Sequence, residues 1–353
     1  MRICFVVRSV FTQALTYTTT HLAYEAFRRG HRVYYTTVNS FTHDDSNSVR
    51  ATVVSPGEGP LSTRASFLEA LKRDEASREE VPLSDFDVVF LRYNPHETET
   101  ERDRGRIPAL EFGRLLKSHG VLVVNDPGGL AKAASKMYLS GFPAEVRART
   151  LITRSAVKVK EFLRELRKPA IIKPLSGFGG QDVFFVKTHR EININQIISA
   201  VSKNGYVLAQ EYLPAVRKGD KRLLLLNGSP IILRGRGAMY ARISAKGEIR
   251  SNMHVGGSRR EAEFTKTEAR IAELIRPKLI ADGLYFVGAD IVGSKLLEIN
   301  VFCPGGINNI NELYGINVGQ AVIEDLEKRV RLWKARPGAS GLAGDSVVLA
   351  KTG

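Results

Sequence analysis

The sequence has few cysteines and no long hydrophobic run. Its 353 residues include only two cysteines, Cys4 and Cys303, so a disulfide framework cannot be the basis of the fold. The N-terminal apolar run at 3–7 is too short for a signal peptide. No stretch approaches the roughly 20 apolar residues of a membrane span. These absences predict a cytoplasmic protein that does not associate with membranes.

The sequence also lacks the signatures of nucleic-acid-binding proteins. Its formal net charge of +15 would attract anionic partners. However, there is no zinc finger, basic zipper or RNA-recognition pattern, and the basic residues are dispersed along the chain. We therefore do not expect nucleic acid to be the main partner. Nucleotide phosphates and substrate carboxylates are the anions that some of these side chains would meet.

The sequence does contain enough apolar residues, 43%, for two or three folded cores. Apolar patterns predict alternating strands and helices in the first part of the chain, with strands at 2–7, 31–38, 87–93 and 121–124 and helices at 18–29 and 66–80. This alternation indicates an α/β region with an open, mainly parallel, Rossmann-like sheet in residues 1–125. An α+β region with hairpins follows, one of them turning at Asn227-Gly228. A Gly- and Ser-containing end from 335 on is predicted to be flexible.

One predicted strand ends in a lysine and a glycine-rich loop. The segment AIIKPLSGFGGQDVFFV places Lys173 shortly before Gly177, Phe178, Gly179 and Gly180. Glycines let backbone N–H groups approach anionic oxygens closely, and a lysine adds a positive charge beside them. The spacing matches neither a Walker loop nor a dinucleotide fingerprint. The pattern indicates a phosphate-binding loop, and an ordinary hairpin turn would fit it equally well.

Two later strands carry acidic and amide side chains. In FVGADIVGSKLLEINV, alternation places Glu298 and Asn300 on one face. A three-residue turn at 293–295 would put Asp290 opposite Glu298, whereas a two-residue turn would put it opposite Leu297, and we expect the longer turn. Burying such oxygens without a partner is costly, and they are ligands that Mg²⁺ prefers. The pattern predicts a magnesium site, with a solvent-facing edge hairpin as the alternative.

The segment VLAQEYLP, followed by KGDKR, offers groups that suit a nucleoside. The strand ends in four residues whose backbone and amide groups could bond an adenine edge, Gln210, Glu211, Tyr212 and Leu213. Asp220 could accept hydrogen bonds from ribose hydroxyls. Arg222 begins an apolar strand, where a guanidinium needs an anion. Taken alone, the segment is explained more simply by an ordinary strand, turn and strand.

A polar segment bounded by glycines, YARISAKGEIRSNMHVGG, follows another predicted strand. It contains donors suited to carboxylates and ends in two glycines; the residues singled out are Arg242, Arg250, Asn252, Gly256 and Gly257. Loops placed after strands often carry binding residues. We expect a loop that covers the substrate, although a surface loop without a ligand could have the same composition.

In this order, these segments resemble prokaryotic glutathione synthetase. The similarity extends from about residue 87 to about residue 330 and includes Lys136 in ASKMY. It implies an ATP-grasp fold with an N-terminal pre-ATP-grasp substrate domain at 1–125, a central lid subdomain at 126–205, a C-terminal subdomain at 206–334 and a tail at 335–353.

The resemblance also implies roles for individual residues. Those implied to bind ATP are Lys136, Lys173, Gly177, Phe178, Gly179, Gly180, Gln210, Glu211, Tyr212, Leu213 and Asp220. Those implied to act in catalysis are Arg222 and Arg250, and those implied to bind substrate are Arg242, Asn252, Gly256 and Gly257. Asp290, Glu298 and Asn300 would hold magnesium, as two ions that Mn²⁺ could replace.

The implied activity is ADP-forming ligation of a carboxylate to an amine through an acyl phosphate. The substrates would be small peptides or amino acids, and the enzyme would be a homo-oligomer. The segment 302–309 departs from the family, because Phe302, Cys303 and two glycines replace hydroxyl residues and amides replace an arginine. This departure predicts an altered amine substrate. The alternative is a nucleotide-binding regulatory or partner-binding relative without ligase activity.

Overall fold

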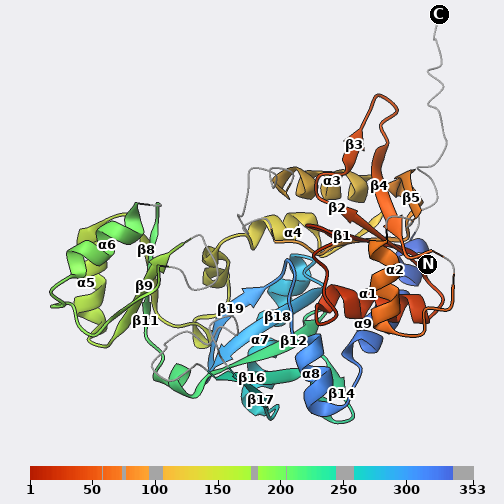
Figure 1. The fold of residues 1–353 in the computed structure, drawn as a ribbon. Helices are drawn as coiled ribbons and strands as arrows, with labels where there is room; N and C mark the ends of the chain where they lie inside the picture. Colours follow the sequence, from red (N-terminus) through yellow and green to blue (C-terminus); the bar gives the residue numbers. More distant parts are fainter. Residues whose placement is uncertain are drawn as a thin grey trace, which may run out of the picture. The chain divides into compact units, whose positions relative to one another are not determined.

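The chain forms two compact units in a computed structural model that describes residues 1–57, 59–73, 77–94, 106–175, 182–203, 205–243 and 258–336 (Figure 1). The first unit holds the N-terminal sheet and residues 319–336. The second unit runs from Gly128 to Val318. Within the described residues, none of the helices has the length and apolar character needed to cross a membrane.

The first unit is built on a parallel sheet, as the alternating pattern predicts. Its parallel strands, in spatial order, are β2 (Arg32–Thr37), β1 (Arg2–Val7), β6 (Val88–Leu91) and β7 (Leu122–Val124). Phe5 on β1 lies between the rings of Tyr35 and Phe90 on the two neighbouring strands, at centroid distances of 5.6 and 5.8 Å. The N-terminal part of this unit contributes the helices α1 (Thr18–Arg28), α2 (Arg64–Lys72) and α3 (Arg106–Ser118).

The helix predicted at 66–80 is wrong in its second half. The helix ends at Lys72, and Ser77–Pro82 forms strand β5. This strand pairs with β4 (Val49–Ser55), which also pairs with β3 (Phe41–His43). The charged residues that suggested a solvated helix instead lie on a strand, where Glu80 meets Arg50 of β4. Backbone pairing along β4 outweighs the weak local helix preference.

Helix α9 (Val318–Lys334) also differs from the expected division, which included it in 206–334. Residues 319–336 belong to the first unit. Arg29 binds Glu327 through Nε and Nη2 at 2.8 and 3.0 Å. The indole nitrogen of Trp333 donates to the Gly120 carbonyl at 2.7 Å. These contacts explain why the helix groups with the N-terminal sheet, while the three-domain division itself remains a prediction.

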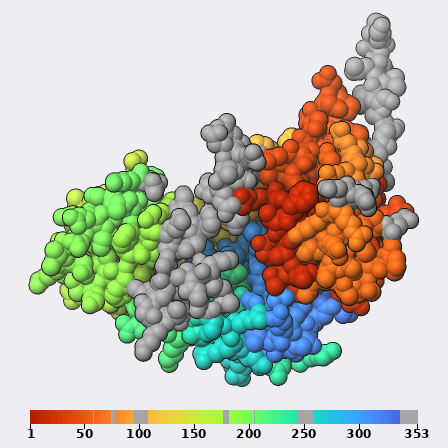
Figure 2. Space-filling model, viewed as in Figure 1, coloured from red at the N-terminus to blue at the C-terminus, as the bar shows by residue number. Residues whose placement is uncertain are grey.

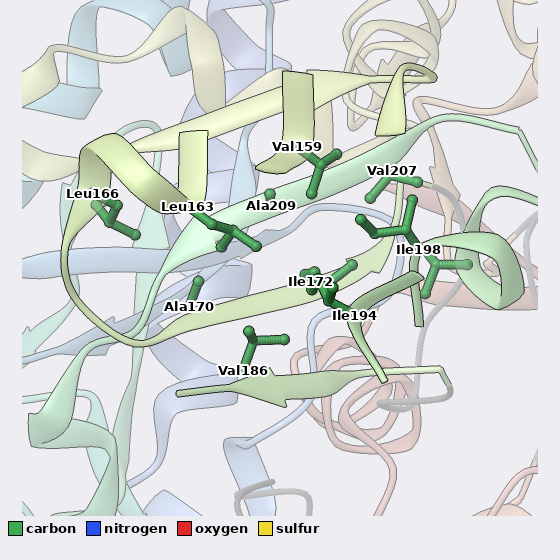
Figure 3. Packing of buried hydrophobic residues seen from close by; sticks show 11 residues of the cluster. Val159, Leu163, Leu166, Ala170, Ile172, Val186, Ile194, Ile198, Val207 and Ala209 are labelled. Carbon is green, nitrogen blue, oxygen red and sulfur yellow. The ribbon is translucent and has the colours of Figure 1, made fainter. Parts of the chain in front are cut away.

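The second unit begins with short helical segments, α4 (Pro127–Lys132) and two 3₁₀ turns (Lys136–Gly141 and Ala144–Val146). A small antiparallel sheet follows, with spatial order β10 (Phe184–Val186), β9 (Ala170–Pro174), β11 (Val207–Glu211) and β8 (Thr150–Thr153). Helices α5 (Ala156–Leu166) and α6 (Ile194–Ser202) pack on it. Figure 3 shows Val159 and Leu163 of α5 facing Ile172 of β9 in the buried cluster. In Figure 2 the residues of this small sheet and its helices are the yellow-green to green atoms.

A second antiparallel sheet completes this unit. Its spatial order is β17 (Ser258–Glu261), β16 (Met239–Ile243), β12 (Asp220–Leu226), β18 (Phe286–Val292) and β19 (Lys295–Asn300). The remaining elements are β13 (Ser229–Pro230), β14 (Ile232–Leu233), β15 (Arg236–Gly237), α7 (Lys266–Ala281) and α8 (Ile307–Tyr314). Leu226 pairs with Ser229, and Asn227 and Gly228 have φ angles of 50° and 74°. The predicted hairpin turn is thus confirmed, with the two positive φ angles that such turns need.

Candidate active site

A row of polar side chains crosses four adjacent strands of the second sheet. Tyr240 on β16 is opposite Arg222 on β12, Arg222 is opposite Asp290 on β18, and Asp290 is opposite Glu298 on β19. Directly opposite residues project from the same face of a sheet. The register therefore places a phenol, a guanidinium and two carboxylates side by side.

The predicted pairing of Asp290 with Glu298 is confirmed, but the predicted three-residue turn is wrong. Val292 pairs with Lys295, so the turn contains only Gly293 and Ser294. The register then shifts between Asp290 and Ile291, and this bulge accommodates the extra residue, Leu297. Gly293 has a φ of 58°, which suits a tight two-residue turn. A bulge re-aims the side chains beside it, and here it brings Glu298 opposite Asp290.

Asp290 is held by two arginines and one amide. Its carboxylate oxygen Oδ2 lies 2.8 Å from both Arg222 Nη2 and Arg242 Nη2, and Arg222 Nε donates to Oδ1. Asn300 Nδ2 donates to Oδ2 at 3.1 Å. Burial alone would raise the pKa of Asp290, but the two guanidinium groups lower it to about 2. Such charge-assisted bonds fix the carboxylate in one orientation.

Asp220 and Arg242 bind each other. Arg242 Nε lies 3.2 and 3.1 Å from the two Asp220 oxygens, and the Asp220 side chain is fully buried. The sequence patterns placed these residues in two separate groups, one near a ribose and one on a substrate loop. The structure joins both groups to Asp290 through the Arg242 guanidinium. Asp220, Arg242, Asp290 and Arg222 therefore form one ion-pair network on this face of the second sheet.

Glu298 is in a different electrostatic state from Asp290. Desolvation and the nearby negative charge of Asp290 raise the pKa of Glu298, while Lys173, Arg222 and Lys136 act in the opposite direction. The side chain still keeps exposed surface. Two adjacent carboxylates with incomplete charge compensation are the arrangement that a hard cation would stabilise.

The donor set fits magnesium. Because Asn300 donates through Nδ2 to Asp290, its amide oxygen is left as an acceptor. Throughout the described ranges, no three His, Cys, Asp or Glu side chains converge on one point. The cation site that these residues can offer therefore consists of two carboxylates and one amide oxygen, all of them hard oxygen ligands.

Two lysines contribute positive charge near Glu298. Lys173 Nζ donates to Gln210 Oε1 at 3.3 Å, and Lys136 Nζ donates to the Leu175 carbonyl at 3.4 Å. Burial lowers the pKa of both amines, to about 8 for Lys173, although Glu298 partly counteracts the effect. Partly desolvated amines are well suited to bind phosphate oxygens.

The end of β11 is tied into the small sheet by its side chains. Gln210 donates to Thr150 Oγ1 at 3.2 Å, and Glu211 pairs with Lys168 at 3.0 Å. The Tyr212 ring packs edge-on against Phe185 at 4.8 Å. Leu213 follows and is half-buried. The Gln210 side chain thus orients Lys173, a role that the sequence pattern did not reveal.

Comparison with known proteins identifies the family of the chain. Residues 1–131 match the N-terminal domain of prokaryotic glutathione synthetase, and residues 135–315 match its ATP-grasp domain. The glutathione synthetase of Vibrio parahaemolyticus is 33% identical over 310 residues, which cover 87% of this chain and 91% of the relative. The chain belongs to the prokaryotic glutathione synthetase family. The Synechocystis glutathione synthetase is 37% identical over 249 residues, or 70% of this chain and 73% of the relative.

Solved structures confirm the ATP-grasp fold of this glutathione synthetase family member. The crystal structure of D-cycloserine synthetase DcsG has a TM-score of 0.61 at 15% identity and covers 93% of this chain and 99% of its own. The ATP-grasp ligase PsnB, complexed with a minimal precursor, has a TM-score of 0.58 at 17% identity, with coverages of 92% and 98%. Family membership makes the chain an ADP-forming carboxylate–amine ligase that uses ATP and Mg²⁺. It does not favour the alternative of a regulatory relative without ligase activity.

Some of the residues that the family resemblance singled out lie outside the described residues. They are Gly177, Phe178, Gly179, Gly180, Arg250, Asn252, Gly256 and Gly257. Tyr240 was not predicted as a site residue, although alternation along β16 places it on the same face as Arg242.

Proposed function

We propose that this glutathione synthetase family member joins the carboxylate of a small peptide or amino acid to the amine of a second substrate other than glycine. The observation that carries the proposal is the row of Arg222, Asp290 and Glu298, with Lys136 and Lys173 near Glu298. This arrangement combines positive charge for phosphates with oxygen ligands for a divalent cation.

Nucleotide binding involves residues from both sheets. Lys136 and Lys173 contact the phosphates of ATP, together with the loop of Gly177, Phe178, Gly179 and Gly180. Gln210, Glu211, Tyr212 and Leu213 line the adenine, and Asp220 lies near the ribose. The low pKa of Lys173 supports this role, because a phosphate supplies the negative charge that a partly buried ammonium lacks.

Asp290, Glu298 and Asn300 hold magnesium, with two ions expected and Mn²⁺ able to replace them. Bound Mg²⁺ neutralises charge on the transferring phosphoryl group. Burial and the neighbouring Asp290 charge both raise the pKa of Glu298, and a bound cation would relieve this cost, which supports the assignment. Arg222 and Arg242 hold Asp290 in place, so Glu298 and the Asn300 oxygen are the more accessible ligands.

The reaction proceeds in two steps. A substrate carboxylate oxygen attacks the γ-phosphorus of ATP, ADP leaves, and an acyl phosphate forms. The amine nitrogen then attacks the acyl carbon, phosphate leaves, and loss of a proton gives the amide. Neither step needs a protein nucleophile, so alignment and charge stabilisation by groups such as Arg222 and Arg250 are sufficient. Arg242, Asn252, Gly256 and Gly257 bind the substrate.

The amine substrate differs from glycine because the segment 302–309 lacks the hydroxyls and arginine of the family pattern. In the structure, Arg259 of β17 donates to Asn309 and Glu312 of α8, and Asn308 donates to Glu312 at 2.9 Å. These bonds join the Asn308 and Asn309 amides of the segment to Glu312 and Arg259, which supports an amine site of altered chemistry.

A coupled assay of ADP release tests this function. The purified protein would receive ATP, Mg²⁺ and γ-glutamylcysteine with glycine, followed by a panel of dipeptides and amines. We expect turnover with pairs other than the first, and a loss of at least about 100-fold in kcat for Glu298→Gln. Glu273→Gln on α7, whose side chain is 70% exposed, is the matched control. Tight ATP binding without amine-dependent ADP release across the panel would contradict the proposal.

We also propose that the protein works in the cytoplasm as a homo-oligomer. Localisation of a tagged chain and its molar mass in solution test these two points. A monomer at assay concentration would contradict the second point without affecting the ligase assignment.

A further inference from the structure

Tyr240 continues the polar row beyond Arg222, and nothing above gives it a role. Only 3% of its surface is exposed. Neighbouring Arg222 and Asp290 bind each other, whereas the part of the chain that the structure describes supplies no hydrogen bond to the Tyr240 hydroxyl. The hydroxyl is not one of the fully buried polar atoms that lack a hydrogen bond in the described residues. It can therefore donate a hydrogen bond to a ligand that lies beside the polar row.

The Tyr240 ring lies against the glycine that precedes helix α8. Gly306 has a φ of 126°, and a Cβ atom there would be 2.9 Å from Tyr240 Cε1 and 3.6 Å from its hydroxyl oxygen. Gly306 therefore leaves room for the ring, and a larger residue there would be destabilising. The hydroxyl lies directly beside the segment 302–309, which departs from the family pattern.

Arg222, a member of the polar row, also holds the backbone of the segment 302–309. Arg222 Nη1 donates to the Gly305 carbonyl at 3.4 Å. A Cβ atom on Gly288 would be 3.0 Å from Arg222 Cδ and 3.2 Å from Pro304 Cβ, which shows how closely these groups pack. Among the described atoms, a Cβ atom on Gly305 would meet open space. One side of the segment is thus packed against Arg222, and Gly305 borders a space.

We propose that Tyr240 is a specificity-determining residue for the amine substrate, which is a small amino acid. The Tyr240 hydroxyl donates a hydrogen bond to the carboxylate of this amino acid, and Gly305 provides the space that it occupies. This inference rests on the proposed ligase function. It adds a mechanism of substrate selection, since a site that bonds a carboxylate discriminates against amines without one.

Steady-state kinetics with two kinds of amine test the inference. The unaltered protein should prefer an amino acid over the alkylamine that lacks only the carboxylate. Tyr240→Phe removes the hydroxyl while keeping the ring. We expect it to raise KM for the amino acid about 10-fold, the effect of one hydrogen bond to a charged group. KM for the alkylamine and for ATP should change less than about 2-fold.

Two further variants separate recognition from folding. Tyr206→Phe, at a tyrosine that is 51% exposed, should leave all constants unchanged. Gly305→Ala adds one methyl group to the space and should restrict the panel to the smallest amines. Equal effects of Tyr240→Phe on the amino acid and the alkylamine, or no effect on either, would overturn the inference while leaving the ligase function intact. Absence of amine-dependent ADP release from the unaltered protein would overturn both.

Discussion

The charge state of individual side chains depends on their neighbours rather than on residue type. Asp290 and Glu298 are directly opposite carboxylates, yet the pKa of Asp290 is lowered and that of Glu298 is raised. The difference arises because two guanidinium groups contact Asp290, whereas burial and the Asp290 charge together raise the pKa of Glu298. Alternation in the sequence predicted which residues share a face. It could not predict the Arg242 contacts, which depend on the register between β16 and β12.

Lys173 gives a pH-dependent prediction. Burial lowers its pKa to about 8, so the amine is charged below that pH and becomes neutral as the pH rises through it. We therefore expect KM for ATP to rise between about pH 7 and pH 9. Lys173→Arg keeps its charge over this range and should flatten the profile. The measurement is KM for ATP against pH for both proteins, and parallel profiles would contradict the assignment of Lys173 to phosphate.

At the scale of elements, the hairpin of β18 and β19 shows the limit of reading turns from sequence. The glycine and serine indicated a turn, but its length depended on whether the strands pair regularly. The bulge at Asp290 is set by packing between strands and has no local sequence signature. In the N-terminal unit, apolar runs predicted β1, β2, β6 and β7. The charged strand β5 was not predicted, because it is stabilised by pairing with β4 rather than by an apolar pattern of its own.

Gly293 gives a prediction about this hairpin. Its φ of 58° is strained for residues with a side chain, although a Cβ atom would meet only Ala215 Cβ at 3.5 Å. We expect Gly293→Ala to lower the free energy of unfolding by about 1 kcal/mol, with a smaller loss for Gly293→Asn. Urea denaturation followed by circular dichroism would measure both. Equal stability of the alanine variant and the unaltered protein would argue against the two-residue turn.

At the scale of the whole molecule, the first unit is discontinuous in sequence, because α9 belongs to it together with the N-terminal strands. Hydrophobic periodicity could indicate that 318–334 is a helix but not which sheet it joins. That choice depends on partners almost 300 positions away in the chain, Arg29 and His31, both of which contact Glu327.

A substitution at Glu327 tests whether its contacts hold α9 in the first unit. The hydrogen bond from Arg29 holds the pKa of Glu327 at about 2, so its stabilising contribution is present above about pH 4.5 and is lost as the pH falls toward 2. Because its side chain is 19% exposed, we expect Glu327→Gln to destabilise the first unit by only about 1 kcal/mol at pH 7. Trp333, the single tryptophan, lies on α9, so its fluorescence reports the unfolding of the first unit. The pH dependence of this unfolding transition should be weaker in the variant. An unchanged midpoint would contradict a role for this ion pair.

The return of α9 has a consequence for how the protein is made. Domains generally fold in the order in which the ribosome releases them. Here the first strands emerge early, but the helix that binds Arg29 and Gly120 is synthesised only after the entire second unit. The N-terminal unit must therefore wait, incomplete, while the rest of the chain is translated, and it reaches its final state last.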